Sequence, residues 1–561
     1  MSVIIDNTIV RISKSSQLTL FDIEFCNANK ISINGNTISF SLVSTSRQCT
    51  FNALKIFSPE LFDGSEKNNA ILNNIYSALS TKYKQIQESF DTYARSVFDK
   101  YDILEDYQKE SAFLLTMRNN NLFSLEQGMG KSLTVIVVSL LLRSMMAKDD
   151  RIVLIVCPAV VKHNWIMELT KWGVPKDEIT MLDSVKSIVA KKEKYIIVNY
   201  RSLKKYLMLL SEKDIFHIIA DECHYIKNIK SGRHKSLNSI ESILGSKLTL
   251  MTGTPITNRV DDLFGYLSVS SHSEGVSYRT FVYRYCKRLN HGRGKIVGVK
   301  NEFRLRSMLS NFLIRVSKDK LKGLSDKRYI DFFFKLHNYK KAYNEAMVEL
   351  SRVMEGKNTS QVNLAIYTVS KILAEAKVGG IAELCRHISS IDGKVVIFGT
   401  FRKPIAMLKE KFGDEAVVVA GGMSSKKKND AINSFLSNDK IKFFIGQYTA
   451  AGIGINLVNS QNVVLMDVPL TPDIIDQAVD RLHRKGQTGV VKVYKTICEN
   501  SLDEVLTKLV NRKRSDSSLV IDGKKLLIDS SSLDIDEIIK YVGEKSKKDI
   551  KIKSIELEVQ S

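Results

Sequence analysis

The spacing of apolar residues changes several times along the chain, and each change marks a different kind of segment. Residues 1–95 begin with short runs that alternate polar and apolar positions, as in KISINGNTISFSLV, and become helix-like from about Asn68. Alternation with a period of two is typical of strands that bury one face, and Asn34-Gly35 is a hairpin-type turn signal. The pattern therefore predicts a small β-containing N-terminal accessory domain over these residues.

Residues 96–270 and 385–515 share a second pattern, in which short continuous apolar runs alternate with longer amphipathic stretches. The runs are RIVLIVCPAVV, KYIIVNY, IFHIIADE and KLTLMTGTP in the first block, and KVVIFGTF, AVVVAGG, IKFFIGQYT and NVVLMDVP in the second. Such runs are typical of parallel strands, because helices cover both faces of the sheet. The sequence thus predicts an α/β fold with two parallel-sheet domains. A basic, mostly helical insertion and linker at 271–384 joins them, and a small C-terminal appendage follows at 516–561.

The charge of the chain narrows the class of partner. Lysine and arginine number 83 against 61 aspartates and glutamates, which gives a formal net charge of +22 over 561 residues. An excess of this size favours a polyanion, most simply nucleic acid, because phosphate contacts supply most non-specific affinity. The alternative is a lysine-rich surface that reflects composition alone.

The cysteines and the N-terminus indicate where the protein works. Seven cysteines occur without a CxxC pair, so neither a zinc site nor a disulfide framework is indicated. The N-terminal MSVIIDNTIV lacks a basic segment ahead of an apolar core, and the longest apolar runs fall short of the ~18 residues expected of a spanning helix. We therefore expect an intracellular protein of the cytoplasm, nucleoid or nucleus that is neither secreted nor bound to a membrane.

A glycine-rich loop in the first α/β block carries candidate chemistry. The stretch SLEQGMGKSLTVI places Gly128, Gly130, Lys131 and Ser132 directly before an apolar helix. Backbone N–H groups and the lysine of such a loop hold phosphate, while the serine hydroxyl can ligate magnesium. The strict phosphate-loop pattern has glycine where this chain has Leu125, so a structural turn is the alternative.

Two acids ninety residues later strengthen the nucleotide interpretation. Asp221 and Glu222 stand at the end of the apolar run IFHIIADECH. At that position one carboxylate can hold the metal and the other can orient the attacking water. The loop and the acid pair together predict a site for ATP and Mg²⁺, with Ser132 and Asp221 as metal ligands and Lys131 on the phosphates.

Further motifs occur in a fixed order along the chain. In chain order they are LEDYQKESAFLL, GMGKS, VCPAVVKHNWIMELTKW, DECH, YIKNIKS, MTGTPITN, GVKNEFRLRSMLSNFLIRVSKD, QYTAAGIGINL and QAVDRLHRKGQ. This set resembles the Swi/Snf-type branch of the superfamily 2 helicase-like ATPases (DEAD/H-box motors) over about residues 100–510. The resemblance implies two RecA-like P-loop lobes and a DNA-dependent ATPase.

The resemblance also implies roles for single residues. Gln108 is placed to read adenine, and Gly454 of QYTAAGIGINL joins the nucleotide-binding set. His224, Thr252 and Thr254 are expected to couple nucleotide to nucleic acid.

Three positions depart from the family pattern. Leu470-Thr471-Pro472 stands where the family has a tryptophan-asparagine-proline triplet, Arg315-Val316 where it has paired arginines, and Ala450 where it has an arginine. The Thr-Ala-Ala of QYTAAGIGINL and the compact span before the second block resemble the annealing-helicase (HARP-like) branch more than nucleosome remodellers.

The stretch QAVDRLHRKGQ supplies groups expected to complete the catalytic site. Arg481 and Arg484 are three residues apart, one helical turn, and Gln477 begins the stretch. If two lobes face each other across a cleft, these arginines reach the γ-phosphate only when the lobes close, so hydrolysis becomes conditional on closure. The alternative is an amphipathic helix with solvated arginines.

Contacts with DNA are expected on the motif loops and on the basic insertion. The candidate nucleic-acid-binding residues are Pro158, Lys162, Lys287, Arg288, Thr400 and Thr449. Such contacts go to phosphates, so little sequence specificity is expected. The segment SYRTFVYRYCKR also fits a base-stacking platform, but Tyr278, Phe281 and Tyr285 follow helical spacing, which favours packing within the insertion.

These features predict an ATP-dependent translocase on double-stranded or branched DNA that remodels forks, branched DNA or protein–DNA complexes. We expect a monomeric motor that uses ATP and Mg²⁺ and works with replication, repair or transcription proteins. Two alternatives are a strand-separating DNA or RNA helicase and an ATP-gated nucleic-acid clamp or switch. Strand-displacement and triplex-displacement assays distinguish the translocase from the helicase.

Overall fold

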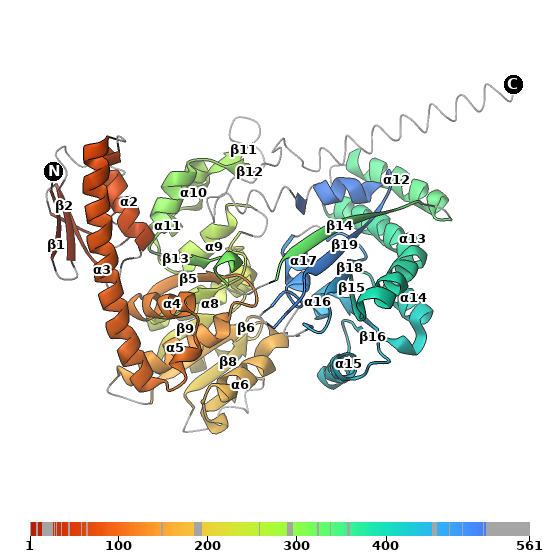
Figure 1. The fold of residues 1–561 in the computed structure, drawn as a ribbon, viewed down its shortest axis with the longest axis horizontal. Helices are drawn as coiled ribbons and strands as arrows, with labels where there is room; N and C mark the ends of the chain where they lie inside the picture. Colours follow the sequence, from red (N-terminus) through yellow and green to blue (C-terminus); the bar gives the residue numbers. More distant parts are fainter. Residues whose placement is uncertain are drawn as a thin grey trace. The chain divides into compact units, whose positions relative to one another are not determined.

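A computed structural model of the protein shows two parallel-sheet lobes and a small N-terminal sheet (Figure 1). The chain divides into two compact units, one up to Lys320 and the other from Leu321 onward. The structure describes residues 2–6, 9–13, 26, 29, 31–34, 36–42, 45, 47–57, 59–62, 65–146, 150–183, 193–256, 259–288, 296–321, 325–336, 338–355, 359–451, 457–469, 472–484, 486–508 and 510–511. The predicted appendage at 516–561 lies outside these residues.

The N-terminal part of the first unit is a four-stranded antiparallel sheet, as predicted. The strand order is β1 (Ser2–Asp6), β2 (Ile9–Ser13), β4 (Thr37–Ser41) and β3 (Ser32–Asn34). Alternate residues of β2 and β4 are buried, because a strand with one solvated face turns every second side chain into the core. Asn34 pairs with Thr37 across the predicted hairpin, and Gly35 itself lies outside the described residues.

Two helices connect this sheet to the first lobe. They are α2 (Arg47–Phe57) and the 32-residue α3 (Glu66–Val97). On α3, the Tyr83 hydroxyl donates to Thr45 O at 3.0 Å, and Phe90 packs edge-on against Phe113 with ring centroids 5.2 Å apart. One helix therefore contacts both the accessory sheet and the lobe.

A second connection involves residues nearly 280 positions apart. Asn29 Nδ2 donates to Ser307 O at 3.0 Å, and the Asn311 backbone N–H donates to Asn29 Oδ1 at 2.9 Å. Met308 is fully buried and belongs to the same hydrophobic core as Val10 and Phe40 of the accessory sheet. The accessory part thus completes its core with a residue of the first lobe.

The first lobe contains a seven-stranded sheet in which every pairing is parallel. The strand order is β13 (Leu313–Val316), β5 (Asn120–Leu125), β10 (Lys247–Met251), β9 (Ile215–Ala220), β6 (Ile152–Cys157), β8 (Tyr195–Asn199) and β7 (Ile179–Met181). Its longer helices are α4 (Asp106–Met117), α5 (Lys131–Ser144), α6 (Lys162–Lys171), α8 (Gly232–Leu244) and α9 (Asp262–Val269). Every residue of β6 and β9 is buried, as expected for strands covered on both faces.

The insertion predicted at 271–384 is largely helical but also contributes a strand to each main sheet. Its elements are α10 (Tyr278–Tyr285), β11 (Cys286–Arg288), β12 (Ile296–Val299), α11 (Glu302–Leu309), β13, β14 (Lys327–Phe334), α12 (Lys340–Glu355) and α13, which ends at Asp392 after starting at Thr359. β13 joins the first sheet and β14 joins the second. The domain boundaries predicted at residues 95, 270, 384 and 515 stay predictions. The two compact units of the structure divide between Lys320 and Leu321.

The aromatic residues of α10 pack inside the first unit. Phe281 and Tyr285 are at most 1% exposed, with ring centroids 5.2 Å apart. The Tyr278 hydroxyl donates to Asp261 Oδ2 at 2.8 Å. The packing interpretation of this segment is confirmed, and a base-stacking platform on these three rings is wrong.

The second lobe contains a six-stranded sheet, again with every pairing parallel. The strand order is β14, β19 (Val491–Cys498), β18 (Asn462–Leu465), β15 (Val395–Gly399), β17 (Phe443–Gln447) and β16 (Ala416–Val419). Helices α14 (Arg402–Phe412), α15 (Ser425–Ser437), α16 (Tyr448–Ala451) and α17 (Pro472–Val479) lie between its strands in the sequence.

A buried ion pair joins three elements of the second lobe. Lys377 Nζ on α13 lies 2.7 Å from Asp503 Oδ2 and donates to Thr496 O on β19 at 2.8 Å. The side chains of Lys377 and Asp503 are 0% and 2% exposed. Buried charges of this kind need a partner, so the pair fixes the long helix against the sheet and the C-terminal segment.

The sequence predicted no disulfide framework and no membrane-spanning helix, and the described residues can be compared with both expectations. All seven cysteines fall within them; each is buried as a thiol, and none forms a disulfide. Among the helices described, none is long and apolar enough to cross a membrane.

Candidate functional site

Three of the predicted motifs lie at one edge of the first sheet. Strands β5, β10 and β9 are neighbours, and the glycine loop, the Thr252–Thr254 turn and the acid pair follow them respectively. Because carboxyl ends of parallel strands meet at the same edge, segments from distant parts of the sequence converge there. This edge is the candidate active site.

The glycine loop has the conformation of a phosphate cradle. Gly128 and Gly130 have φ values of 81° and 77°, and Gly130 is the N-cap of α5. The backbone angle favours glycine at position 130, and a Cβ atom there would lie 2.2 Å from Gln108 Nε2 and displace that side chain. The open N–H groups at the start of α5 can therefore bind an anion.

Lys131 and Ser132 begin α5, directly after the loop. Lys131 Nζ donates to Leu125 O at 2.8 Å, which holds the ammonium among the loop carbonyls. Its charge also helps to lower the pKa of Asp221 across the edge. Ser132 is half-buried in the first turn of the helix. The two side chains thus lie where the sequence predicts phosphate and metal contacts.

Gln108 connects α4 to the glycine loop. Its Nε2 donates to Met129 O at 3.0 Å, and its Oε1 accepts the Glu105 backbone N–H at 2.9 Å. The Tyr107 hydroxyl also donates to Met129 O, at 3.1 Å. A carboxamide has a second N–H and a second lone pair, so recognition of adenine by Gln108 stays a prediction.

Asp221 is held by hydrogen bonds from two sides. Trp165 Nε1 donates to Oδ2 and the Glu222 backbone N–H donates to Oδ1, both at 2.9 Å. Burial and the negative charge of Glu222 raise the pKa of Asp221 to about 6, against the lowering effect of these bonds and of Lys131. A nearby cation would stabilise this carboxylate.

The donor set at this edge fits Mg²⁺. A carboxylate from Asp221 and a hydroxyl from Ser132 are oxygen ligands, and Mg²⁺ is commonly held by one or two such groups together with substrate phosphates. Among the described residues there is no cluster of three or more His, Cys, Asp or Glu side chains that would hold a metal by itself. Any metal here would therefore depend on the bound phosphates.

Glu222 occupies an unusual backbone conformation. Its φ is 49°, a left-handed value that costs energy in a residue with a side chain. Its Oε2 lies 3.2 Å from His224 Nδ1, and the Glu222 side chain remains 23% exposed. Tyr200 supports this turn, since its hydroxyl donates to Asp221 O at 2.8 Å. Glu222 is thus the accessible acid of the pair.

Thr252 and Thr254 form a compact turn after β10. The fully buried Thr252 hydroxyl lies 3.2 Å from both the backbone N–H and the carbonyl of Thr254. Gly253 O in the same turn accepts from Arg315 Nη1 at 3.1 Å. Coupling by the two threonines stays a prediction.

The sequence interpretation missed three residues of this site: Trp165, Tyr200 and Arg315. Trp165 lies within VCPAVVKHNWIMELTKW and is one of only two tryptophans, which was a usable signal. Tyr200 directly follows the run KYIIVN, but nothing in its local pattern indicates that its hydroxyl reaches Asp221.

The second-lobe arginines lie beyond the helix on which they were expected. Gln477 is on α17, which ends at Val479, so Arg481 and Arg484 occupy the turns that follow. Asp480, the residue after the helix, pairs with Lys327 of β14, its Oδ1 2.8 Å from the lysine Nζ. The expectation of one helical turn between the arginines is wrong, because residues 480–484 form turns and bends after the helix has ended.

Both arginines are more buried than a solvated helix would allow. Arg481 is only 7% exposed. Arg484 Nε donates to Asp480 O at 2.8 Å, and burial lowers the pKa of Arg484. The alternative of solvated arginines is therefore wrong. Gly454 and Lys485 lie outside the described residues.

Some of the candidate DNA-contacting residues already bind other side chains, and others are exposed. Lys162 is buried and its ammonium donates to Asp183. Thr400 donates its backbone N–H and its hydroxyl to Asp467, at 2.8 and 2.5 Å. Contact of Lys162 with DNA stays a prediction, and the local sequence does not show the carboxylate that lies beside it.

The remaining candidate DNA contacts differ in their exposure. Lys287 and Arg288 on β11 and Thr449 at the start of α16 are exposed, while Pro158 is buried after β6. The exposed residues are available for phosphate contacts.

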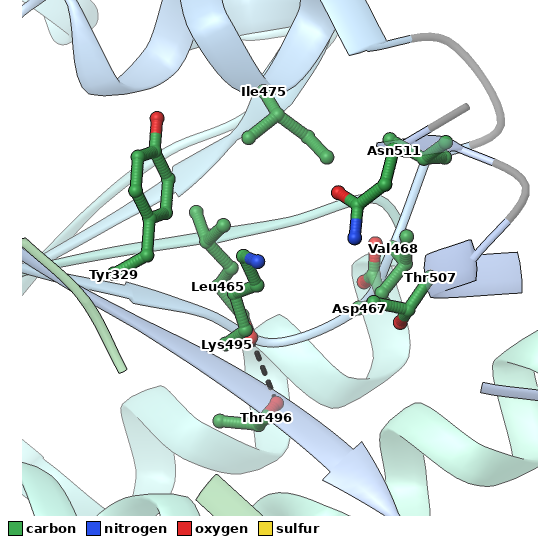
Figure 2. Close-up of a pocket in the computed structure, with 10 residues that line it drawn as sticks. Tyr329, Leu465, Asp467, Val468, Ile475, Lys495, Thr496, Thr507 and Asn511 are labelled. Carbon is green, nitrogen blue, oxygen red and sulfur yellow. Dashed lines mark hydrogen bonds between the residues drawn. The ribbon is translucent and has the colours of Figure 1, made fainter. Parts of the chain in front are cut away.

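A small pocket lies in the second unit (Figure 2). Residues of three strands and of the C-terminal segment line it, including Tyr329, Leu465, Asp467 and Asn511. The Thr496 hydroxyl, drawn with its hydrogen bond in Figure 2, already donates to Leu465 O at 2.7 Å. None of the predicted site residues lines this pocket.

The fold and the edge geometry define an α/β ATPase with two RecA-like lobes, in which one lobe carries the phosphate loop and acid pair. The SNF2-related domain matches residues 107–378, and the helicase conserved C-terminal domain matches residues 379–486. The chain belongs to the SNF2 family of helicase-like ATPases.

The chain is similar to several curated proteins. It is 27% identical to the SWI/SNF-related matrix-associated actin-dependent regulator of chromatin subfamily A-like protein 1 homolog of Caenorhabditis elegans, over 72% of this chain and 60% of that protein. It is 24% identical to the human DNA annealing helicase and endonuclease ZRANB3, over 75% of this chain and 40% of that protein. The chain thus spans less than two thirds of the length of these relatives.

A solved structure, the Sulfolobus solfataricus SWI2/SNF2 ATPase core in complex with dsDNA, is also similar. It shares 23% identity at a TM-score of 0.37, covering 78% of this chain and 96% of that one.

Proposed function

We propose that this chain is a DNA-dependent ATPase that translocates on double-stranded DNA and remodels forks, branched DNA or protein–DNA complexes. The observation that carries the proposal is the convergence of the glycine loop, the Thr252 turn and the acid pair on neighbouring strands β5, β10 and β9. ATP and Mg²⁺ are the proposed cofactors.

In this proposal the first lobe binds the nucleotide. The N–H groups at the start of α5 and the Lys131 ammonium hold the phosphates, while Ser132 and Asp221 hold the metal, which neutralises charge on the phosphates. Glu222, the accessible acid, orients the attacking water. Trp165 keeps the Asp221 carboxylate in position through its hydrogen bond.

The second lobe supplies arginines for the transition state. The Arg484 side chain donates to Asp480 O, and the Arg481 side chain is buried. Neither side chain therefore has the freedom of an exposed arginine. A held guanidinium loses little entropy when it meets a phosphate. Turnover in this proposal requires one of the two to reach the γ-phosphate.

Duplex DNA is the proposed partner because a net charge of +22 favours binding to a polyanion. Lys287, Arg288 and Thr449 are exposed contacts for the backbone phosphates. The names of the two relatives, a regulator of chromatin and a DNA annealing helicase and endonuclease, support a DNA partner. Branched DNA and forks are therefore the proposed substrates.

The first test is ATP hydrolysis by the full chain with duplex DNA, single-stranded DNA or RNA. Duplex DNA is expected to stimulate turnover most, and the apparent DNA affinity is expected to fall steeply with salt because phosphate contacts release counterions. Stimulation by RNA alone would contradict the proposal.

A second test distinguishes translocation from its alternatives. A translocase displaces the third strand of a triplex but leaves a simple duplex paired. Displacement of duplex strands would instead identify a helicase. Nucleotide-dependent DNA binding without displacement of either would identify a clamp.

A further inference from the structure

Arg315 joins two of the loops that form the candidate ATP site. It lies on β13, the edge strand beside β5. Its Nη2 donates to Glu126 Oε1 at 2.7 Å, and its Nη1 donates to Gly253 O at 3.1 Å. Glu126 is the first residue of the glycine loop and Gly253 lies in the Thr252 turn, so one guanidinium fixes the distance between two nucleotide-site segments.

Glu126 is in turn held by the chain that follows β13. Its Oε2 accepts the Lys318 backbone N–H at 3.1 Å. One carboxylate oxygen is therefore bound by Arg315 on β13 and the other by Lys318, shortly before the first unit ends at Lys320. The side chains of Arg315 and Glu126 are 15% and 31% exposed, so the pair is screened only in part by solvent.

We propose that Arg315 and Glu126 are positioning residues that link the connector between the lobes, residues 317–321, to the glycine loop. A change of strain in the connector moves the Lys318 N–H, and this shifts the Glu126 carboxylate at the start of the loop. The Arg315 guanidinium, which contacts both Glu126 and Gly253, transmits the same displacement to the Thr252 turn. This proposal rests on the ATPase function proposed above.

A purely structural role does not require this geometry. The backbone of β13 already pairs with β5, with Arg315 opposite Ser124. The guanidinium donates one hydrogen bond to the neighbouring strand, from Nη1 to Ser124 Oγ at 3.3 Å, and its shorter bonds go to two loops in two N–H directions. Lysine keeps the charge but cannot provide the planar fork.

The test uses Arg315→Lys and Glu126→Gln in the full chain, with Arg151→Lys as the matched control. Arg151 also makes an arginine–carboxylate contact in the first lobe, with its Nε 3.0 Å from Asp214 Oδ1. It directly precedes β6 and so lies at the amino ends of the strands, away from the candidate site. Three quantities are measured: the melting temperature, the Kd for Mg·ADP, and the kcat with and without duplex DNA.

Amide hydrogen exchange of residues 316–320, with and without Mg·ADP, provides a fourth measurement that needs no turnover. In the wild-type chain, nucleotide is expected to change exchange at the Lys318 amide. In Arg315→Lys and Glu126→Gln this response is expected to disappear, and stimulation of kcat by duplex DNA is expected to fall about tenfold. The Kd is expected to stay within about threefold because the N–H groups of α5 are intact.

Two outcomes would overturn the proposal. One is a normal exchange response and normal DNA stimulation in both variants. The other is an equal loss in Arg151→Lys, which would indicate a general effect on the lobe. If the wild-type chain shows no stimulation by DNA, the proposed function fails by itself, and the exchange measurement still decides whether loop and connector are linked.

Discussion

The two lobes share one architecture but keep their charged side chains in different places. In the first lobe, Lys131, Ser132 and Glu222 stay partly accessible at the carboxyl edge of the sheet. In the second lobe, Lys377 and Asp503 are buried against each other. The contrast shows that a duplicated fold need not duplicate a site. The charged groups named in the first lobe lie at the candidate site, whereas this pair of the second lobe holds a helix against its own sheet.

The largest effect is expected at the arginines of the second lobe. Arg484→Ala should reduce DNA-stimulated turnover by about a thousandfold or more, because an arginine finger contributes on that scale. Nucleotide binding, measured in parallel, should change little. Arg386→Ala is the control, because Arg386 is an exposed arginine of the same lobe that donates only to Lys411 O. Near-normal hydrolysis in Arg484→Ala would mean that Arg484 serves only its own lobe.

The next effect separates two functions within the first lobe. Glu222→Gln should retain nucleotide binding and slow hydrolysis by about 10²- to 10⁴-fold, because a general base is lost while the phosphate contacts remain. Lys131→Ala should weaken nucleotide binding itself. Nucleotide Kd and single-turnover rates distinguish the two variants. Collapse of binding in Glu222→Gln would show that this acid is a ligand or a structural group.

The buried pair of the second lobe tests stability without touching the first. Lys377→Met leaves Asp503 in the core without its cation, which typically costs about 3–5 kcal/mol. Arg352→Met is the control, since Arg352 lies 2.9 Å from Glu349 in a pair whose two side chains are both exposed, and this change should have little effect. Urea unfolding of the full chain measures both. Equal stability of the two variants would contradict the contrast between the lobes.

The smallest effect is a dependence on pH at the first-lobe site. Because the pKa of Asp221 is raised to about 6, its carboxylate takes up a proton below that pH and loses its attraction for a cation. Affinity for Mg²⁺ and nucleotide should fall about tenfold for each pH unit below about 6, a fall that Asp221→Asn should not show. Titration of nucleotide binding at pH 5 to 8 measures this. A flat wild-type profile would contradict metal ligation by Asp221.

The same shift has a defined sign for stability. The folded pKa lies above the ordinary value of 3.8, so the folded state binds the proton more tightly than the unfolded state between these values. The contribution of Asp221 to stability therefore decreases as pH rises through about 4 to 6. At neutral pH the carboxylate destabilises the lobe that it serves, as expected of a group kept for function.

Much of the fold could be predicted from local patterns. Continuous apolar runs indicated buried parallel strands, and the loop before Lys131 and the acids at 221 and 222 indicated the nucleotide edge. These signals are local because strands, glycine turns and strand ends depend on nearby residues. The sequence also predicted that the loop and the acid pair share one site, and their convergence follows because carboxyl ends of neighbouring parallel strands meet at one edge.

The rest depends on partners far away in the sequence. No local window shows that β13 and β14 join different sheets, that Asp183 neutralises Lys162, or that Lys327 pairs with Asp480 just after α17. Arg315 shows the same limit. It was noted as a departure from a pattern, but its contacts with Glu126 and Gly253 arise only when three strands are side by side.

The hydrogen bonds of Asn29 have a consequence for how the chain is made. Asn29 and Ser307 are 278 positions apart, and Met308 fills the core of the accessory sheet. At a synthesis rate of about 5–20 residues per second, the accessory part waits for tens of seconds before the residues that complete it have been made. Although it is synthesised first, its core receives Met308 only when most of the first unit has been made.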